Sequence, residues 1–350
     1  WATEKRLHDQ AVAWGDLLPA PEALIAQLEA RFEALGMTNP DGGGLALETA
    51  GLLYDQRGRA LYGQQGQPAE AAVAFEKAVA TLGLSHGLQR ALTDDEVDTL
   101  RLEASVNASY AWQQRAKNLW YEHGRSHPGA DEAAARAEEN LFRALRLDVE
   151  NPAARQAALY LGDMFQTRGG NTTPDLTELG EMREFYGRTA RAYDVAEWWN
   201  NYAFWSRETG TATEEAGDAT AAAKLYEQSY EAYTNAIRLD PENSRYVNDT
   251  GLMLLYHLGR DLDEAERLFL RSWELGKSVC ENPFVEQAVY DHNLSAYGDA
   301  LLNLARLYLM QGKLERADEL VGELLAVAPE RVDAVMTKRQ IDQARDQGEV

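Results

Sequence analysis

The clearest periodic pattern in the chain lies near its C-terminal end, between residues 298 and 331. Apolar residues recur at three- and four-residue spacing in two segments, 300–310 and 314–327, which only residues 311–313 separate. Each segment therefore predicts an amphipathic helix, and the short break predicts an antiparallel turn. Because one hairpin of this size cannot bury both of its apolar faces, we expect it to stack on neighbouring hairpins.

Several positions of this hairpin match the pattern of a tetratricopeptide repeat, a unit of roughly 34 residues. The matching residues are Leu304, Tyr308, Ala317 and Pro329. The segment therefore resembles a tetratricopeptide repeat. A second strong match is the run AIRLDPEN at residues 236–243, which is typical of the end of such a repeat. The resemblance implies an all-α fold, a right-handed α-solenoid of helix-turn-helix repeats.

The same alternation of helical segments and short breaks covers most of the chain, and no strand-like alternation occurs. Two stretches rich in Gly and Thr interrupt it and predict loop insertions. The predicted segments are capping helices over 1–44, an array of about six hairpins over 45–331 with insertions near 170–174 and 210–217, a linker helix or spacer over 281–296 inside that array, and a C-terminal capping helix over 332–350.

Composition agrees with a folded helical chain and limits its partners. Of 350 residues, 45% are apolar and 10 are proline, values that suit a folded protein. Lys and Arg number 34 against 57 Asp and Glu, so the formal net charge is -23. This charge repels phosphate backbones and anionic membrane surfaces, so nucleic acid is not an expected partner. Solubility, a saline environment or an acidic docking face would each explain the charge.

Cys280 is the single cysteine, so neither an intramolecular disulfide nor a cysteine metal cluster is expected. No apolar run is long enough to span a bilayer, and we expect no direct membrane insertion by this chain. The sequence begins at Trp1 without Met, as a processed or trimmed chain does. A removed signal peptide or anchor and a cloning boundary explain this start equally well. Localisation and oligomeric state are left open.

Catalytic chemistry has no clear candidate in the sequence. The closest histidine pair, His123 and His127, is separated by Gly124 and followed by Pro128, which argues against a shared metal ion on one helical face. The motifs of zinc proteases, serine hydrolases, phosphate-binding loops and dinucleotide-binding folds are missing. The sequence therefore predicts no enzyme activity, no cofactor and no metal.

In a tetratricopeptide array the first helix of each hairpin lines the concave surface, and the resemblance implies which side chains point into that groove. In this chain they are Tyr160, Asp163, Asn200, Asn201, Phe204, Asn248, Asp249, Asn303 and Arg306. An Asn side chain carries both a donor and an acceptor, so a row of them can pair with the backbone of an extended peptide. Alternatively, these Asn side chains form hydrogen bonds within their own hairpins.

Residues 198–205 hold more aromatic side chains than one buried helix face absorbs. We therefore expect a ring such as Trp198 or Trp199 to reach a surface as a hot spot for binding. The resemblance implies a non-enzymatic scaffold or adaptor that binds a protein or an extended peptide in the concave groove. The alternative is a structural subunit that assembles into a larger complex through the edges or the convex face of the array.

Overall fold

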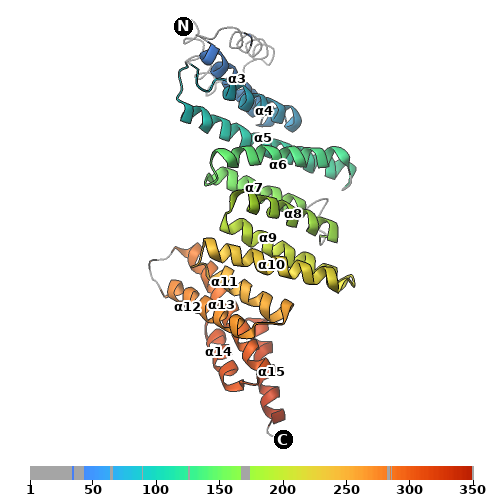
Figure 1. The fold of residues 1–350 in the computed structure, drawn as a ribbon, viewed down its shortest axis with the longest axis vertical. Helices are drawn as coiled ribbons and strands as arrows, with labels where there is room; N and C mark the ends of the chain where they lie inside the picture. Colours follow the sequence, from blue (N-terminus) through green and yellow to red (C-terminus); the bar gives the residue numbers. More distant parts are fainter. Residues whose placement is uncertain are drawn as a thin grey trace. The chain divides into compact units, whose positions relative to one another are not determined.

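All regular elements in the described part of the chain are helical, and the helices pack in sequential pairs (Figure 1). The all-α class and the helical repeat architecture are therefore confirmed. The computed structural model describes residues 34, 43–63, 66–88, 90–124, 127–166, 174–281, 284 and 286–348, without the side chains of 166, 288–293 and 348. The predicted capping helices over 1–44 lie outside these residues except for Ala34 and the two glycines that begin the first described helix.

The chain divides into two compact units, Trp1–Pro174 and Asp175–Val350. The helices of unit 1 are α3 (Gly43–Gly63), α4 (Pro68–Leu84), α5 (Asp94–His123), α6 (Pro128–Leu147) and α7 (Pro152–Gln166). Helices α3 and α4 form one hairpin and α5 and α6 the next, while α5 also packs against α3 and α7. We call the surface formed by α3, α5 and α7 the first-helix surface of unit 1.

Unit 2 continues the same arrangement. Its helices are α8 (Leu176–Tyr193), α9 (Ala196–Glu215), α10 (Ala219–Leu239), α11 (Ser244–Leu252) with its π-helical extension η1 (Met253–Leu258), α12 (Leu262–Cys280), α13 (Gln287–Met310), α14 (Leu314–Val327) and α15 (Val332–Gly348). The pairs α9–α10, α11–α12 and α13–α14 are hairpins. The first-helix surface of unit 2 is formed by α9, α11 and α13, followed by α15.

The hairpin that the sequence predicted most clearly is confirmed. Helix α13 ends at Met310 and helix α14 begins at Leu314. Gly312 makes the turn between them with a φ of 72°. Leu304, Tyr308, Ala317 and Val321 are buried in a core shared with α11 and α12. Close approach of two helices requires small residues in this core. A Cβ atom on Gly251 would lie 2.8 Å from Cε1 of Phe269.

The prediction of a loop insertion at 210–217 is wrong, because α9 continues to Glu215 and only a short turn follows. Gly210 lies inside the helix, where a Cβ atom would stand 2.7 Å from the Tyr226 ring of α10. The hydroxyls of Thr209 and Thr213 donate to carbonyls four residues earlier, each at 2.6 Å. Glycine therefore marks a close helix contact here, and threonine is tolerated because its hydroxyl is bonded within the helix.

The predicted linker helix at 281–296 is also corrected, because α13 runs unbroken from Gln287 to Met310. Gly298 lies inside it, at a point where a Cβ atom would meet the side chains of Arg331 and Leu324. The glycine thus serves packing rather than helix termination. Residues 170–173 of the other predicted insertion lie outside the described part of the chain.

Candidate functional site

Two of the predicted groove residues in unit 2 are bonded to each other. Nδ2 of Asn303 on α13 donates to Oδ1 of Asn248 on α11 at 3.1 Å, and the exposed fractions of the two residues are 5% and 2%. Nδ2 of Asn248 donates to Asp249 at 3.0 Å, and the Tyr256 hydroxyl donates to Oδ1 of Asn303 at 3.0 Å. These two amides therefore join neighbouring hairpins, whereas the alternative interpretation of the Asn row placed such bonds within one hairpin.

The predicted residues of α9 form fewer hydrogen bonds than those of α11 and α13. Asn200 and Asn201 are half-buried, and Nδ2 of Asn200 makes a long hydrogen bond of 3.4 Å to Oδ1 of Asn201. The Phe204 ring packs edge-on against Trp205 at 4.8 Å, and the Arg207 guanidinium lies 5.0 Å from its centre. Oδ1 of Asn200 is buried and has no hydrogen-bond partner among the described residues.

The charged side chains of Asp249, Arg207 and Arg245 form a group on the first-helix surface of unit 2. Burial raises the pKa of the Asp249 carboxyl, while Arg207 and Arg245 act to lower it. Tyr233 is fully buried beneath this group, and its hydroxyl has no hydrogen-bond partner among the described residues. Burial also raises the pKa of Tyr233. Asp249 is therefore a buried carboxyl with two arginines acting on it.

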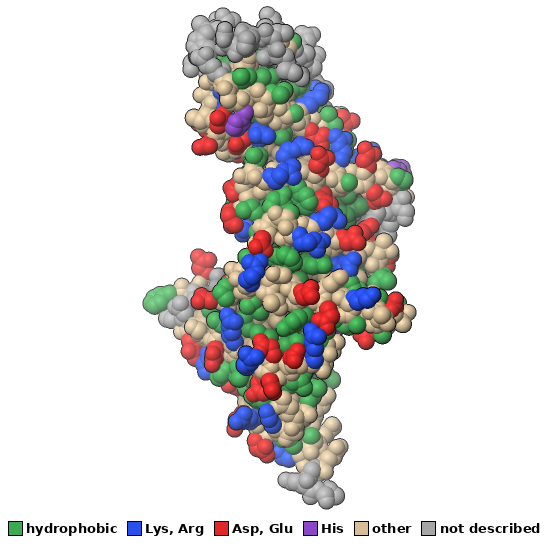
Figure 2. Space-filling model, viewed as in Figure 1, with side chains coloured by type: hydrophobic (Ala, Val, Ile, Leu, Met, Phe, Trp, Pro, Cys, Tyr) green, Lys and Arg blue, Asp and Glu red, His purple; other side chains and the backbone are tan. Residues whose placement is uncertain are grey.

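Arg306 contributes to a bridge rather than standing alone. Its Nε donates to the Thr337 hydroxyl at 3.2 Å, which ties α13 to α15. Next to it, Arg331 pairs with Asp333 at 2.9 Å and also with Asp299. On the face shown in Figure 2, Lys and Arg side chains lie among Asp and Glu side chains instead of gathering in one patch. The first-helix surface of unit 2 is thus a polar network whose members mostly pair with each other.

The aromatic residues at the start of α9 serve packing. Trp198 is fully buried, with its ring edge-on to Tyr193 at 5.6 Å, so it is excluded as a surface hot spot. Trp199 is half-buried, and its Nε1 donates to Asp194 at 2.8 Å. Asp194 also accepts from Arg238 at 2.8 Å. Because α9 packs against both α8 and α10, more than one of its faces is covered.

Unit 1 presents aromatic side chains on its first-helix surface. Tyr62 on α3 is 40% exposed and Tyr160 on α7 is 48% exposed, with Tyr110 on α5 between them. The rings of Tyr110 and Tyr160 lie 6.0 Å apart with a tilt of 55°. The pKa of Tyr110 is raised by burial and then by Tyr160 and Tyr62, and α3, which carries Tyr62, packs against α5. We call these three residues the tyrosine surface.

The tyrosine surface rests on a fixed support. Gln113 donates to the Ala157 carbonyl at 3.3 Å and so joins α5 to α7. Arg59 pairs with Asp55 at 2.7 Å and approaches Glu103 at 3.5 Å, which joins α3 to α5. None of the three tyrosine hydroxyls has a hydrogen-bond partner in the part of the chain that the structure describes. These contacts join the helices that carry the rings, and the three hydroxyls remain without partners among the described residues.

Asp163, one turn after Tyr160, borders this surface. Its side chain is exposed at the tip, but partial burial raises the pKa of the carboxyl, and Lys117 acts to lower it. Of the tyrosine surface, the sequence singled out only Tyr160. The sequence could also have predicted Tyr62 and Tyr110 as contact residues, because each is a tyrosine near the same face of a successive first helix.

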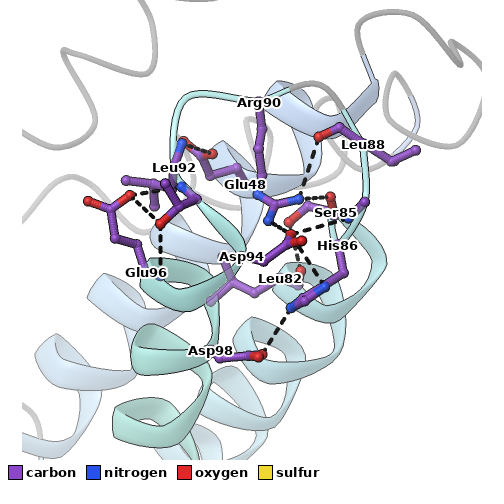
Figure 3. Close-up of polar contacts among 12 residues, drawn as sticks. Glu48, Leu82, Ser85, His86, Leu88, Arg90, Leu92, Asp94, Glu96 and Asp98 are labelled. Carbon is purple, nitrogen blue, oxygen red and sulfur yellow. Dashed lines mark hydrogen bonds and ion pairs between the residues drawn. The ribbon is translucent and has the colours of Figure 1, made fainter.

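A polar cluster that the sequence pattern did not reveal fastens the loop between α4 and α5 (Figure 3). The fully buried Glu48 of α3 accepts hydrogen bonds from the backbone amides of Ala91 and Leu92 at 3.1 and 3.0 Å. Arg90 donates to the Ser85 carbonyl and pairs with Asp94. Since these groups satisfy the loop backbone, the cluster has a structural role.

In the described ranges, no group of three or more His, Cys, Asp and Glu side chains could hold a metal ion. The rings of His123 and His127 stack at 4.8 Å at the turn between α5 and α6. Among the described helices, none combines the length and the apolar character needed to cross a bilayer.

Comparison with known proteins adds little to this picture. No family model and no curated protein matches the chain. Among solved structures, BtubC (BKLC) from P. vanneervenii is 14% identical, with 88% of this chain and 89% of that chain covered and a TM-score of 0.27. A circular tandem repeat protein with novel repeat topology is 12% identical, with 94% and 79% covered and a TM-score of 0.27. At these TM-scores neither likeness carries an argument, and the tetratricopeptide resemblance stays a prediction.

Proposed function

We propose that this chain is a non-enzymatic scaffold or adaptor that binds an extended segment of a partner protein on its first-helix surfaces. The observation that carries the proposal is the tyrosine surface of unit 1. Tyrosine gives a large contact area at a low cost in side-chain entropy, and its hydroxyl adds a directional hydrogen bond. Rings that are held rigidly and partly exposed are the residues that dominate binding energy at protein interfaces.

In unit 2 the proposed contacts are those predicted residues whose side chains are half-buried. They are Asn200, Asn201, Phe204, Asp249 and Arg306. Asn248 and Asn303 support them from below, since both are buried and bonded to each other. The mixed charges around them suit a partner recognised by local pairing rather than by one strong field.

The test begins with peptides selected from a displayed random library on the full chain, with affinity measured by titration calorimetry. We expect Tyr160→Ala to weaken binding roughly ten-fold, as the loss of one hot-spot ring does. The matched control is Tyr121→Ala, because Tyr121 on α5 is 77% exposed but lies three turns beyond Tyr110. Equal affinity of the parent chain and the Tyr160 variant for every selected peptide would reject the proposal.

One observation favours the alternative, a structural subunit of a larger complex. Val332 and Met336 lie one turn apart on α15 and are 70% and 54% exposed. Apolar side chains left open at the end of a repeat array are where a further unit can stack. If Met336→Glu dissociates a defined oligomer in sedimentation experiments while no peptide binds, this function replaces the first.

A further inference from the structure

We infer that the segment bound at the tyrosine surface is a proline-rich chain in the polyproline II conformation. The inference rests on the proposed function and names the chemical class of its ligand. It is carried by what Tyr62, Tyr110 and Tyr160 offer together: ring faces, three hydroxyls without partners among the described residues, and no backbone groups.

The groups that the surface lacks argue against other peptide conformations. An added β-strand derives its affinity from pairing with the backbone of a sheet edge. Here the surface is made by α-helices, whose interior amides and carbonyls are bonded within the helix. An amphipathic helix needs a broad apolar groove, but Glu103 and Gln114 are exposed on the same helix as Tyr110. A strand or an amphipathic helix would therefore leave its main source of affinity unused.

The groups that the surface does offer match polyproline II. This conformation has no internal hydrogen bonds, so its carbonyls are free to accept from tyrosine hydroxyls. Proline has no backbone N–H, so the ligand does not need the acceptors that helices cannot supply. Proline-rich segments dock in aromatic-lined grooves for these reasons, and their stiffness lowers the entropy lost on binding.

The spacing of the tyrosine rings is also compatible with a polyproline II ligand. The rings of Tyr110 and Tyr160 lie 6.0 Å apart and are tilted by 55°. A polyproline II chain rises about 3.1 Å per residue, so a step between these two rings covers about two residues. Three neighbouring first helices at about 8–10 Å from axis to axis span about 20 Å, which a segment of about seven residues crosses.

The charge of the chain predicts which residues flank the prolines of the ligand. The net charge of -23 favours a ligand that carries Arg or Lys, since opposite charge speeds encounter. Next to the rings, Asp163 and Glu103 are exposed carboxylates, while Arg59 and Lys117 are the nearby cations. We therefore expect basic residues at an end of the segment, with a contribution to affinity that salt reduces.

The experiment uses the full chain and a fluorescein-labelled probe of Pro-Pro-Ser repeats with two Arg residues at one end. The control probe has Ser in place of every Pro and the same ends. By fluorescence anisotropy, we expect the proline probe to bind at least about ten-fold more tightly than the control. Tyr110→Ala should weaken it roughly ten-fold, Tyr110→Phe by less, and Tyr121→Ala by less than about two-fold.

The outcomes separate this inference from the function on which it rests. If library peptides without proline bind more tightly than the proline probe, and Tyr160→Ala weakens them, the function stands and the inference is overturned. If neither class of peptide depends on Tyr110 or Tyr160, both fail. Circular dichroism of each variant checks that the helices are intact, and a variant that unfolds is replaced by its Phe counterpart.

Discussion

Asn303 has the position of a peptide-binding residue, but its side chain instead joins neighbouring helices. Its position on α13 is the one from which an asparagine could reach a peptide backbone, yet its amide joins Asn248 on one side and accepts from Tyr256 on the other. The exposed fraction of 5% leaves no room for a ligand to replace these partners. Asn201, which occupies the related place on α9, is half-buried and more loosely bonded.

The first prediction compares these two asparagines. Asn303→Ala removes the donor to Oδ1 of Asn248 and the acceptor of the Tyr256 hydroxyl, so we expect a loss of about 1–3 kcal/mol in the free energy of unfolding. Asn201→Ala should change it by less than about 0.5 kcal/mol. Urea unfolding followed by circular dichroism measures both. Equal stability of the two variants would contradict the roles assigned to these residues.

The second prediction concerns a glycine at a helix contact. A Cβ atom at Gly251 would lie 2.8 Å from Phe269, so Gly251→Leu should separate α11 from α12 and cost about 1–3 kcal/mol. Gly322 on α14 is the matched control, because nothing lies within 4 Å of its Cβ position. Gly322→Leu should leave stability unchanged or raise it by up to about 1 kcal/mol, since leucine favours a helix. Thermal melting distinguishes the two, and a stable Gly251 variant would reject the contact.

At the scale of an element, α9 differs most from the sequence pattern. Its last turns contain Gly210 and three threonines, residues that weaken an isolated helix. The helix persists because α10 packs along it and because Thr209 and Thr213 bond to carbonyls of the preceding turn. Tertiary contacts thus override local propensity, as they commonly do for helices of marginal intrinsic stability.

The third prediction tests this extension of α9. We expect the amides of residues 210–215 to exchange with deuterium nearly as slowly as those of 203–209, because they belong to the same packed helix. Mass spectrometry of exchanged and digested protein measures this, with residues 203–209 of the same helix as the internal reference. Rapid exchange throughout 210–215 would restore the loop that the sequence predicted.

At the scale of the whole molecule, the net charge of -23 acts on both units. Most ion pairs are on the surface, such as Lys338 with Asp318 at 2.7 Å, where each contributes little to stability. Repulsion among the excess carboxylates is spread over the chain and opposes folding. Salt screens both effects, so its net effect on stability shows which one is larger.

The fourth prediction follows from this comparison. Raising NaCl from about 0.01 to about 0.5 M should raise Tm by roughly 2–4 °C, because screening removes more repulsion than attraction. Scanning calorimetry measures the shift. KCl at the same ionic strength is the control for specific ion binding. A fall in Tm would mean that the ion pairs are the larger effect.

The sequence by itself determined the all-α class, the α13–α14 hairpin and the small residues at its helix contact. Those features depend on local periodicity, on turn residues such as Gly312, and on the spacing of Leu304 and Ala317, which neighbouring residues along the chain specify. The tertiary structure alone decided that Asn303 is buried and that α9 extends to Glu215. It also brought Tyr110 and Tyr160 within 6.0 Å. Each of these depends on which helix lies beside which, and residues distant in sequence set that arrangement through burial and close packing.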